Sequence, residues 1–337
     1  MESFAHLHVH TEFSLLDGQC KIKNLLKKAH ADGMTGMAIT DHGNMFGIKD
    51  FFDAAKSMNK DWAKAGEPTI MPIFGCEVYV AHRGLSFKEG KADMSGWHLI
   101  LLAKNKKGYQ NLIKLVSIGW VDGYYMRPRI DHEVLEKYHE NLICCSACLG
   151  GEIARKFDMG DLDGAEQAIL WHKNLFGDDY YLEMQRHPSK NPLYNPQCYE
   201  KQKPYNAFLQ QMAAKHGVKL IASNDVHFVD EDNGEAHDHL ICLNTGKDLD
   251  DPNRMRYTLQ EWFKTTAEMN ELFSDVPEAL SNTMEIVGKC EQYDIENGPI
   301  MPNFEIPAEF GTEADYRAHL TDIDLFNEFT QDENGNV

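Results

Sequence analysis

The sequence lacks several features that define common protein classes. None of its 337 residues lies in an apolar stretch approaching the roughly 20 residues of a membrane-spanning helix, which excludes an integral membrane protein. Its start, MESFAHLHVHTEF, has no basic segment followed by an apolar run, so no secretory signal is expected. Basic residues are few: 33 Lys and Arg against 53 Asp and Glu give a formal charge of −20. Such a chain repels phosphate-rich partners unless bound cations or a local basic patch reverse the field, so non-specific coating of DNA is not expected.

The eight cysteines do not form a zinc-ribbon pattern. Cys145 and Cys148 make a lone CxxC pair, whereas a zinc ribbon needs two such pairs. Scattered cysteines in a chain without an export signal indicate reduced thiols, and we expect a cytoplasmic location.

Short apolar and β-branched segments alternate with amphipathic helical patterns, which is typical of βαβ units around a parallel sheet. We expect seven strands, at residues 4–9, 36–40, 70–80, 98–103, 142–146, 180–183 and 219–223. Helices are expected between them, at residues 22–31, 46–57, 109–118, 165–175 and 207–216. A closed β/α barrel fits this alternation better than an open doubly wound sheet, because no GxGxxG turn follows the first strand.

The pattern changes after about residue 255. Amphipathic helices are expected at residues 258–273 and 277–290, followed by a proline- and acid-containing tail at 299–337. We therefore expect a metal-binding barrel over residues 1–270. Residues 271–337 are expected to be the truncated, mainly helical beginning of a second domain or a linker.

Residue types that bind transition metals gather at the expected strand ends, where barrel enzymes keep their active sites. His8 and His10 form an i, i+2 pair in the first strand, and Asp225 and His227 form another after the last; such a pair points to one side of a strand. Single candidates lie between them: Asp17, His42, Glu77, His98 and Cys148.

These nine side chains are too many for one tetrahedral zinc, which takes three or four protein ligands. They would serve two or three metals if Glu77 bridges, and paired metals can clamp the attacking and leaving oxygens of a phosphoester. Each residue alone has an ordinary alternative as a core histidine, a solvated strand end or a turn. It is the combination that favours a metal centre.

The motifs, in their order, resemble the polymerase and histidinol phosphatase (PHP) domain superfamily, and within it the N-terminal region of bacterial DNA polymerase III α subunits. The stretches that carry the resemblance are HLHVHT and SLLDG at residues 6–11 and 14–18, AITDHGNMFG at 38–47, GCEVY at 75–79, HLILLAKN and GYQNL at 98–105 and 108–112, SACLGGE at 146–152, and ASNDVH at 222–227.

The resemblance implies an α/β fold, a distorted seven-stranded β/α (TIM-like) barrel that holds two or three divalent ions. The implied ligands are His8, His10, Asp17, His42, Glu77, His98, Cys148, Asp225 and His227. Zinc or manganese, and also iron, suit such a set, and a thiolate at Cys148 favours zinc. His6 stands where phosphatase members tend to have aspartate, and we expect it to contact a ligand rather than a metal.

The same resemblance implies a role in DNA replication, as part of a DNA-directed DNA polymerase. The barrel would be a phosphoesterase of the 3′–5′ exonuclease proofreading type, with Glu77, Asp225 and His98 in catalytic roles. Implied partners are the primer 3′ end and other holoenzyme subunits, such as a proofreading subunit. Two alternatives stay open: a metal-stabilised scaffold that braces polymerase and partner, and a free-standing phosphatase such as histidinol phosphatase, which the helices beyond residue 255 disfavour.

A magnesium-dependent polymerase site is not expected in this chain. In the family such a site rests on a Pro-Asp-Ile-Asp-type motif, and the similar string TDIDL at residues 321–325 lacks the leading proline and the third aspartate. We expect this string to be a surface loop.

Basic and aromatic residues interleave in one place, YYMRPR at residues 124–129. Arginines can clamp phosphates and tyrosines can stack on bases, which makes Arg127 and Arg129 candidates for substrate binding. In the alternative interpretation the two arginines pair with Asp122 and Asp131 in a structural loop.

Overall fold

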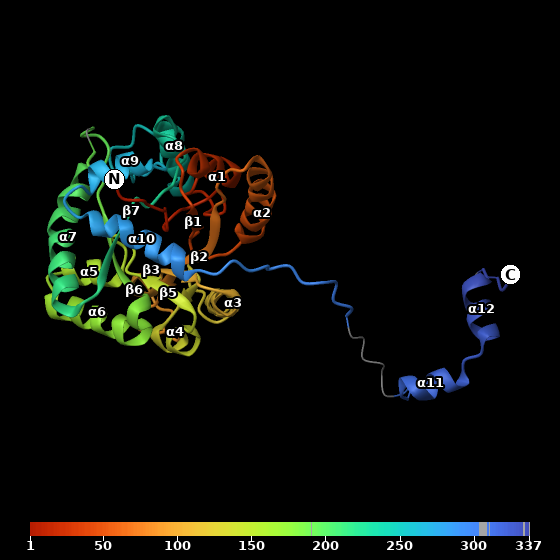
Figure 1. Ribbon diagram of the computed structural model, residues 1–337. Coiled ribbons are helices and arrows are strands. Elements are labelled where there is room, and N and C mark those ends of the chain that lie inside the picture. The colour runs from red at the N-terminus through yellow and green to blue at the C-terminus, as the bar shows by residue number, and fades with distance from the viewer. Residues whose placement is uncertain (190, 303–308, 310, 333, 337) are drawn as a thin grey trace. The chain divides into compact units, whose positions relative to one another are not determined.

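The computed structural model describes residues 1–189, 191–302, 309, 311–332 and 334–336 (Figure 1). The chain divides into two compact units, Met1–Asp294 and Ile295–Val337. The first unit extends beyond residue 270, where we expect the barrel to end. That a second functional domain follows stays a prediction.

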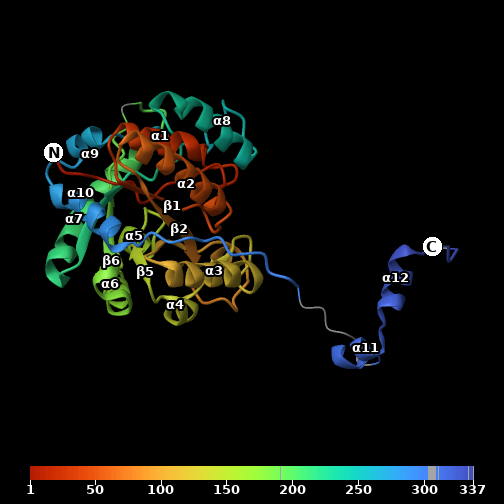
Figure 2. The ribbon, with the colours of Figure 1, turned by 45° about the vertical axis from the view of Figure 1, so that its right-hand side comes forward.

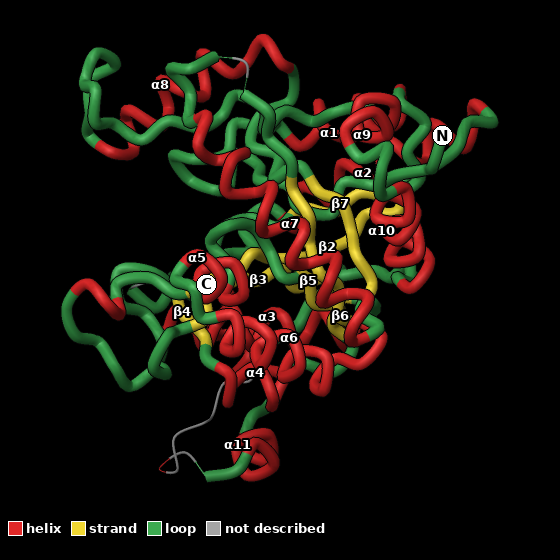
Figure 3. Tube along the Cα trace, turned by 90° about the vertical axis from the view of Figure 1, so that its left-hand side faces the viewer, coloured by secondary structure: helices red, strands yellow, loops and turns green. Residues whose placement is uncertain are grey.

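A curled mixed sheet forms the centre of the first unit, with helices around it (Figure 3). Its strands are neighbours in the order β1 (Gly36–Ile39), β2 (Met71–Val80), β3 (Trp97–Ala103), β5 (Leu142–Cys145), β6 (Tyr180–Gln185) and β7 (Lys219–Ser223), and the short β4 (Arg129–Ile130) pairs with β2. Strand burial is nearly continuous, as expected for a sheet covered on both faces.

The expectation of a wholly parallel sheet is wrong for β3, which runs antiparallel to both β2 and β5. The connection from β2 to β3 contains only the 3-10 turn η1 (Lys91–Asp93), and a parallel pair usually needs a helical crossover. Reversal of β3 places its first residues at the same end of the barrel as the last residues of the parallel strands. His98 therefore reaches the site from the beginning of its strand.

The expected strand at residues 4–9 is not a regular strand, although this segment closes the barrel. The Ala38 amide donates to His6 O at 2.9 Å and the Thr40 amide to Val9 O at 2.8 Å on the β1 side. On the β7 side, the His10 amide donates to Val226 O at 2.7 Å. The segment thus lies between β1 and the end of β7, and the result is a distorted β/α barrel.

Helices cover the outside of the sheet (Figure 2). The helices of the first unit are α1 (Ile22–Ala31), α2 (Ile48–Ala65), α3 (Lys106–Val121), α4 (His132–Tyr138), α5 (Glu152–Asp158), α6 (Leu162–Phe176), α7 (Pro196–His216), α8 (Gly234–Thr245), α9 (Thr266–Leu272) and α10 (Pro277–Lys289), with 3-10 turns η2 (Gly177–Asp179) and η3 (Glu231–Asn233). Helix α1 shows the reason: its buried Ile22, Leu25, Leu26 and Ala29 recur at helical spacing on one face.

The helix expected at residues 258–273 is only partly present. Residues before Thr265 are not helical, because the Glu261 carboxylate accepts from the backbone amides of Thr258 and Gln260 and offers the chain a local alternative to a helix. Helix α9 then begins at a capping box of Thr265 and Glu268.

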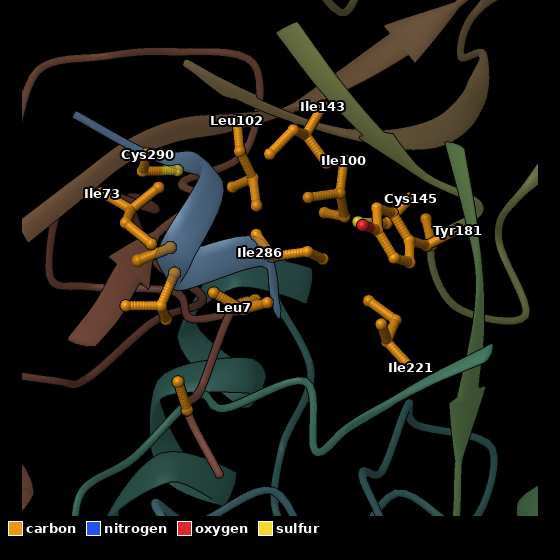
Figure 4. Packing of buried hydrophobic residues seen from close by; sticks show 14 residues of the cluster. Leu7, Ile73, Ile100, Leu102, Ile143, Cys145, Tyr181, Ile221, Ile286 and Cys290 are labelled. Atoms are coloured by element: carbon orange, nitrogen blue, oxygen red, sulfur yellow. The ribbon is translucent and has the colours of Figure 1, made fainter. Parts of the chain in front are cut away.

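Helix α10 packs into the main hydrophobic cluster (Figure 4). Its residues Ile286 and Val287, together with Cys290 just beyond it, join Leu7, Ile73 and other residues of the sheet. Gly36 in β1 permits this close approach, since a Cβ there would lie 2.7 Å from Val287 Cγ1.

The second unit contains α11 (Glu313–His319) and α12 (Asp322–Thr330). The expectation of a surface loop at residues 321–325 is wrong: Thr321 and Asp324 form a capping box that starts α12, and the residues are exposed. Among the described residues, no helix is both long and apolar enough to cross a lipid bilayer.

Candidate metal centre

The nine side chains singled out from the sequence lie at one end of the barrel. Three groups have ligand atoms that all lie within 4.8 Å of one another: His8, His10, Glu77 and Asp225; Glu77, His98 and Cys148; and His10, His42 and His227. Asp17 adjoins the third group, because its Oδ2 lies 2.7 Å from His42 Nε2 and 3.6 Å from His227 Nε2.

Glu77, in β2, connects two of these groups through its two oxygens. Its Oε2 lies 2.7 Å from His8 Nε2 and 3.2 Å from His10 Nε2. Its Oε1 lies against His98 Nδ1 and 3.4 Å from His42 Nδ1. The side chain is fully buried. This arrangement is the one expected of a bridging carboxylate.

Asp225 faces the same centre from the segment after β7. Its Oδ1 lies 3.1 Å from His8 Nε2 and 3.3 Å from His10 Nε2. The backbone of Asp225 has a φ of 48°, in the left-handed region that aspartate and asparagine tolerate better than other non-glycine residues. Strained backbone of this kind is concentrated at functional sites.

Cys148 completes the second group and approaches the same nitrogen of His98 as Glu77 does. Its Sγ lies 3.6 Å from His98 Nδ1 and accepts from the Gly150 amide at 3.4 Å. The other member of the CxxC pair, Cys145, is buried in the hydrophobic cluster. The pair therefore does not act as one chelating unit.

Three supporting residues were missed by the sequence reasoning. Glu183 Oε1, from β6, lies 2.6 Å from His8 Nδ1, on the side of the ring away from the centre. Ser14 Oγ lies 3.1 Å from His10 Nδ1. The Tyr257 hydroxyl donates to Asp17 Oδ1 at 2.9 Å. A charged residue inside an apolar strand was the available signal for Glu183; Tyr257 had none, because it borders a stretch expected to be helical.

Charge coupling in the centre opposes the effect of burial. Burial alone would raise the pKa of Glu77, yet the imidazoles of His98 and His42 hold it well below its usual range. Burial likewise favours a higher pKa at Asp225, which His8 and His10 lower well below the usual value. Both carboxylates are therefore ionised and available as ligands at neutral pH.

The residues present fit divalent metal ions. Glu77 Oε1, Asp225 Oδ1 and His42 Nδ1 are buried atoms that make no well-directed hydrogen bond, and their polar neighbours are other candidate ligands of the same centre. Buried polar atoms normally have a partner, so such a set calls for a ligand between them. The donors are imidazole nitrogen, carboxylate oxygen and one sulfur, a set that suits transition metals.

The centre opens into two cavities. One, of about 440 Å³, is lined by Asp17, His42 and His98 together with aromatic residues and Arg127. The other, of about 300 Å³, is lined by His98, Cys148 and Asp225 and by Arg155 and Arg256. A substrate can therefore approach the ligand groups from either side of His42 and His98, which border both cavities.

Two further expectations need correction. Arg129 cannot bind substrate in this structure, because it is fully buried and donates to Gly123 O at 3.1 Å and Phe87 O at 3.0 Å; Arg127 alone is exposed at the cavity. His6 does not contact a ligand. Its Nε2 lies 2.8 Å from Lys264 O and its ring packs on Phe263, and burial lowers its pKa to about 3.

A fourth group of possible ligands, His132, Glu152 and His172, lies outside this centre. Lys156 Nζ already lies 2.7 Å from Glu152 Oε1, so this carboxylate has a cationic partner within the protein. The group joins α4, α5 and α6 as a polar network.

A family comparison agrees with the geometry. The family model described as "PHP domain" matches residues 6–187, which is more than half of the chain. The chain therefore belongs to this family. Among curated proteins it is similar to DNA polymerase III subunit alpha of Borreliella burgdorferi, with 45% identity over 323 residues, covering 94% of this chain and 26% of that protein. The subunits of Thermus aquaticus and Campylobacter jejuni are each 37% identical, covering 97% and 92% of this chain.

The chain spans about a quarter of the length of these relatives. Similar solved structures include PsfC from Pseudomonas syringae, with 15% identity, a TM-score of 0.36 and coverage of 67% of this chain and 78% of that one. Another is histidinol phosphate phosphatase from Lactococcus lactis, crystallised with zinc, L-histidinol and phosphate, with 12% identity, a TM-score of 0.33 and coverage of 67% and 87%.

Proposed function

We propose that this chain is the phosphoesterase domain of a DNA polymerase III α-type protein, and that it hydrolyses a phosphodiester at the 3′ end of DNA. The observation that carries the proposal is the fully buried Glu77, whose two oxygens face two different ligand groups: Oε2 faces His8 and His10, and Oε1 faces His98 and His42. Divalent ions held there would activate a water and polarise a phosphoryl oxygen.

In this proposal the chain's own residues hold the metal ions and orient the ligand side chains. Glu77 and Asp225 provide ionised carboxylates between the ligand groups, and His98 extends the second group toward both cavities. Glu183 fixes the ring of His8 so that its Nε2 points into the centre. Many nitrogen donors and one thiol favour zinc or manganese over magnesium, which prefers oxygen ligands.

The wider setting is part of the same proposal. Similarity to polymerase III α subunits supports a parent protein with polymerase activity elsewhere, DNA and other replication subunits as partners, and a cytoplasmic location. The polymerase site would lie outside this chain. Because the first compact unit reaches Asp294, we propose that a further domain begins beyond it.

Hydrolysis of a 3′-labelled oligonucleotide tests the proposal. Wild-type protein supplied with Mn²⁺ or Zn²⁺ should release the 3′ label from the oligonucleotide. Mg²⁺ alone should not support this release. Glu77→Gln and Asp225→Asn, which keep size but remove charge, should abolish cleavage in folded protein. The matched control is Glu166→Gln, which alters a carboxylate 2.7 Å from His216 outside the centre and should cleave like wild type.

A purely structural role is the competing proposal, since the ligands join segments from residue 8 to residue 227. Fully metal-loaded wild type that cleaves neither an oligonucleotide nor a generic phosphodiester would favour the purely structural role. Equal cleavage by wild type and Glu77→Gln would indicate a contaminating nuclease. Both proposals expect a chelator to lower the melting temperature, because metals bound only by the folded state stabilise it.

A further inference from the structure

Three large aromatic side chains are exposed along the wall of the 440 Å³ cavity. Phe46, Trp120 and Tyr124 are 56%, 42% and 47% exposed, and all three line the same cavity as His42 and His98. Single exposed apolar residues are common on proteins, whereas a contiguous group beside a polar cavity marks a binding surface.

The rings form an ordered row. Trp120 and Tyr124 have ring centroids 5.6 Å apart and planes 18° from parallel, and Phe46 lies 6.1 Å from Trp120 at 36°. The Trp120 indole N–H donates to Gly43 O at 2.8 Å, which ties this ring to the residue after His42. The row is therefore held in place relative to the metal centre before any ligand binds.

Arg127 provides a positive charge in the same cavity as the three rings. Its guanidinium lies 5.9 Å from the ring of Tyr79, and that ring lies 5.3 Å from the ring of His98. Among the described residues, no carboxylate lies within ion-pair distance of Arg127. In an acidic chain, an exposed arginine here favours an anionic group that also reaches the metal centre.

We propose that Phe46, Trp120 and Tyr124, which we call the aromatic row, stack on the unpaired bases at the end of a single DNA strand, while Arg127 contacts a backbone phosphate. The inference rests on the proposed function and identifies the form of its substrate. Trp120 and Tyr124 are close to parallel, and all three rings are exposed. Exposed aromatic rings can stack on any base, and such stacking is independent of sequence. Paired bases in a duplex are not accessible to such rings, so the row selects frayed or single-stranded ends.

Two matched single-stranded oligonucleotides test the role proposed for the aromatic row. One carries a base on each of its last two nucleotides, and the other has abasic sites there with the same phosphodiesters. Wild type should cleave the base-bearing strand with the higher kcat/KM. Trp120→Ala and Tyr124→Ala should each reduce this preference by about 5- to 150-fold, the equivalent of roughly 1–3 kcal/mol per stacked base.

Conservative variants separate stacking from a structural role. Trp120→Phe removes the hydrogen bond to Gly43 but keeps a ring, and Tyr124→Phe removes only the hydroxyl; both should retain most of the preference. The matched control is Phe87→Ala, since Phe87 is 43% exposed but lies outside this cavity. Its preference should equal that of wild type.

A binding measurement makes the result independent of catalysis. Fluorescence anisotropy with a cleavage-resistant phosphorothioate version of each oligonucleotide should show the same loss in Trp120→Ala and Tyr124→Ala. Equal cleavage of base-bearing and abasic strands by an active wild type would overturn the stacking role of the aromatic row and leave the proposed function intact. If wild type cleaves neither strand, the proposed function fails, and unchanged affinity in Trp120→Ala would overturn the row as well. Such a result would leave the rings as a docking surface for a protein.

Discussion

Replacing Glu183 should weaken metal binding, although Glu183 belongs to none of the three ligand groups. His8 Nε2 faces Glu77 and Asp225, and its Nδ1 lies 2.6 Å from Glu183 Oε1. With a metal ion bound at Nε2, the ring proton would lie on Nδ1 and would be donated to Glu183. The same carboxylate accepts from Gln185 Nε2 at 3.0 Å and from Ser223 Oγ at 2.5 Å. A carboxylate behind a ligating histidine fixes its orientation and raises its basicity.

Two separate arguments give the expected loss of metal affinity. Removing a partner behind a ligating histidine typically costs 10- to 100-fold in metal affinity, or roughly 1.4–2.7 kcal/mol. Leaving the buried Nδ1–H of His8 unpaired costs about 1–3 kcal/mol, which agrees. Metal affinity should therefore fall by about 10- to 100-fold in Glu183→Ala. It should fall less in Glu183→Gln, which keeps a carbonyl acceptor.

Competition with a chromophoric chelator measures these affinities. Glu166→Gln serves as the control, because Glu166 is also paired with a histidine, at 2.7 Å, but outside the centre. Wild-type affinity in Glu183→Ala would refute the role assigned to Glu183. An equal loss in Glu166→Gln would refute the claim that the effect is local.

Three further predictions concern stability. Gly43→Ala should lower the melting temperature, at a cost of about 1–3 kcal/mol, because φ is +59° and a Cβ would lie 2.6 Å from Pro128 Cγ. Asp238→Ala should cost roughly 3–5 kcal/mol in urea unfolding, since it leaves the buried Arg254 guanidinium without its carboxylate. Burial lowers the pKa of Lys264 from 10.5 to about 7; because the unfolded chain then binds more protons, this residue should make stability rise with pH between about 7 and 10.5, by up to about 1.4 kcal/mol per unit. Lys264→Met should lack that rise, and an identical pH profile in both proteins would contradict the assignment.

The position of the ligands could be predicted from the sequence because it depends on a simple rule. Strands of a barrel bring their ends together, so pairs such as His8 and His10 or Asp225 and His227 meet whatever the details of the helices. The structure places all nine expected side chains in or beside three adjoining groups. Their roles as metal ligands stay a prediction until metal is measured.

Strand direction and loop structure were harder to predict. Nothing in the apolar pattern of residues 98–103 distinguishes an antiparallel β3 from a parallel one, and the missing crossover helix was the only signal. Arg127 and Arg129 are alike in sequence, but the strand pair β2–β4 buries Arg129 and leaves Arg127 exposed. Such differences arise from long-range packing, which local pattern does not contain.

The metal content of purified, unchelated protein tests the central claim most directly. Elemental analysis of wild type should give two or three transition-metal ions per chain, and Glu77→Gln should hold at least one fewer, because it removes the charge shared by two ligand groups. Less than about one ion per wild-type chain, or equal content in the two proteins, would contradict a centre bridged by Glu77.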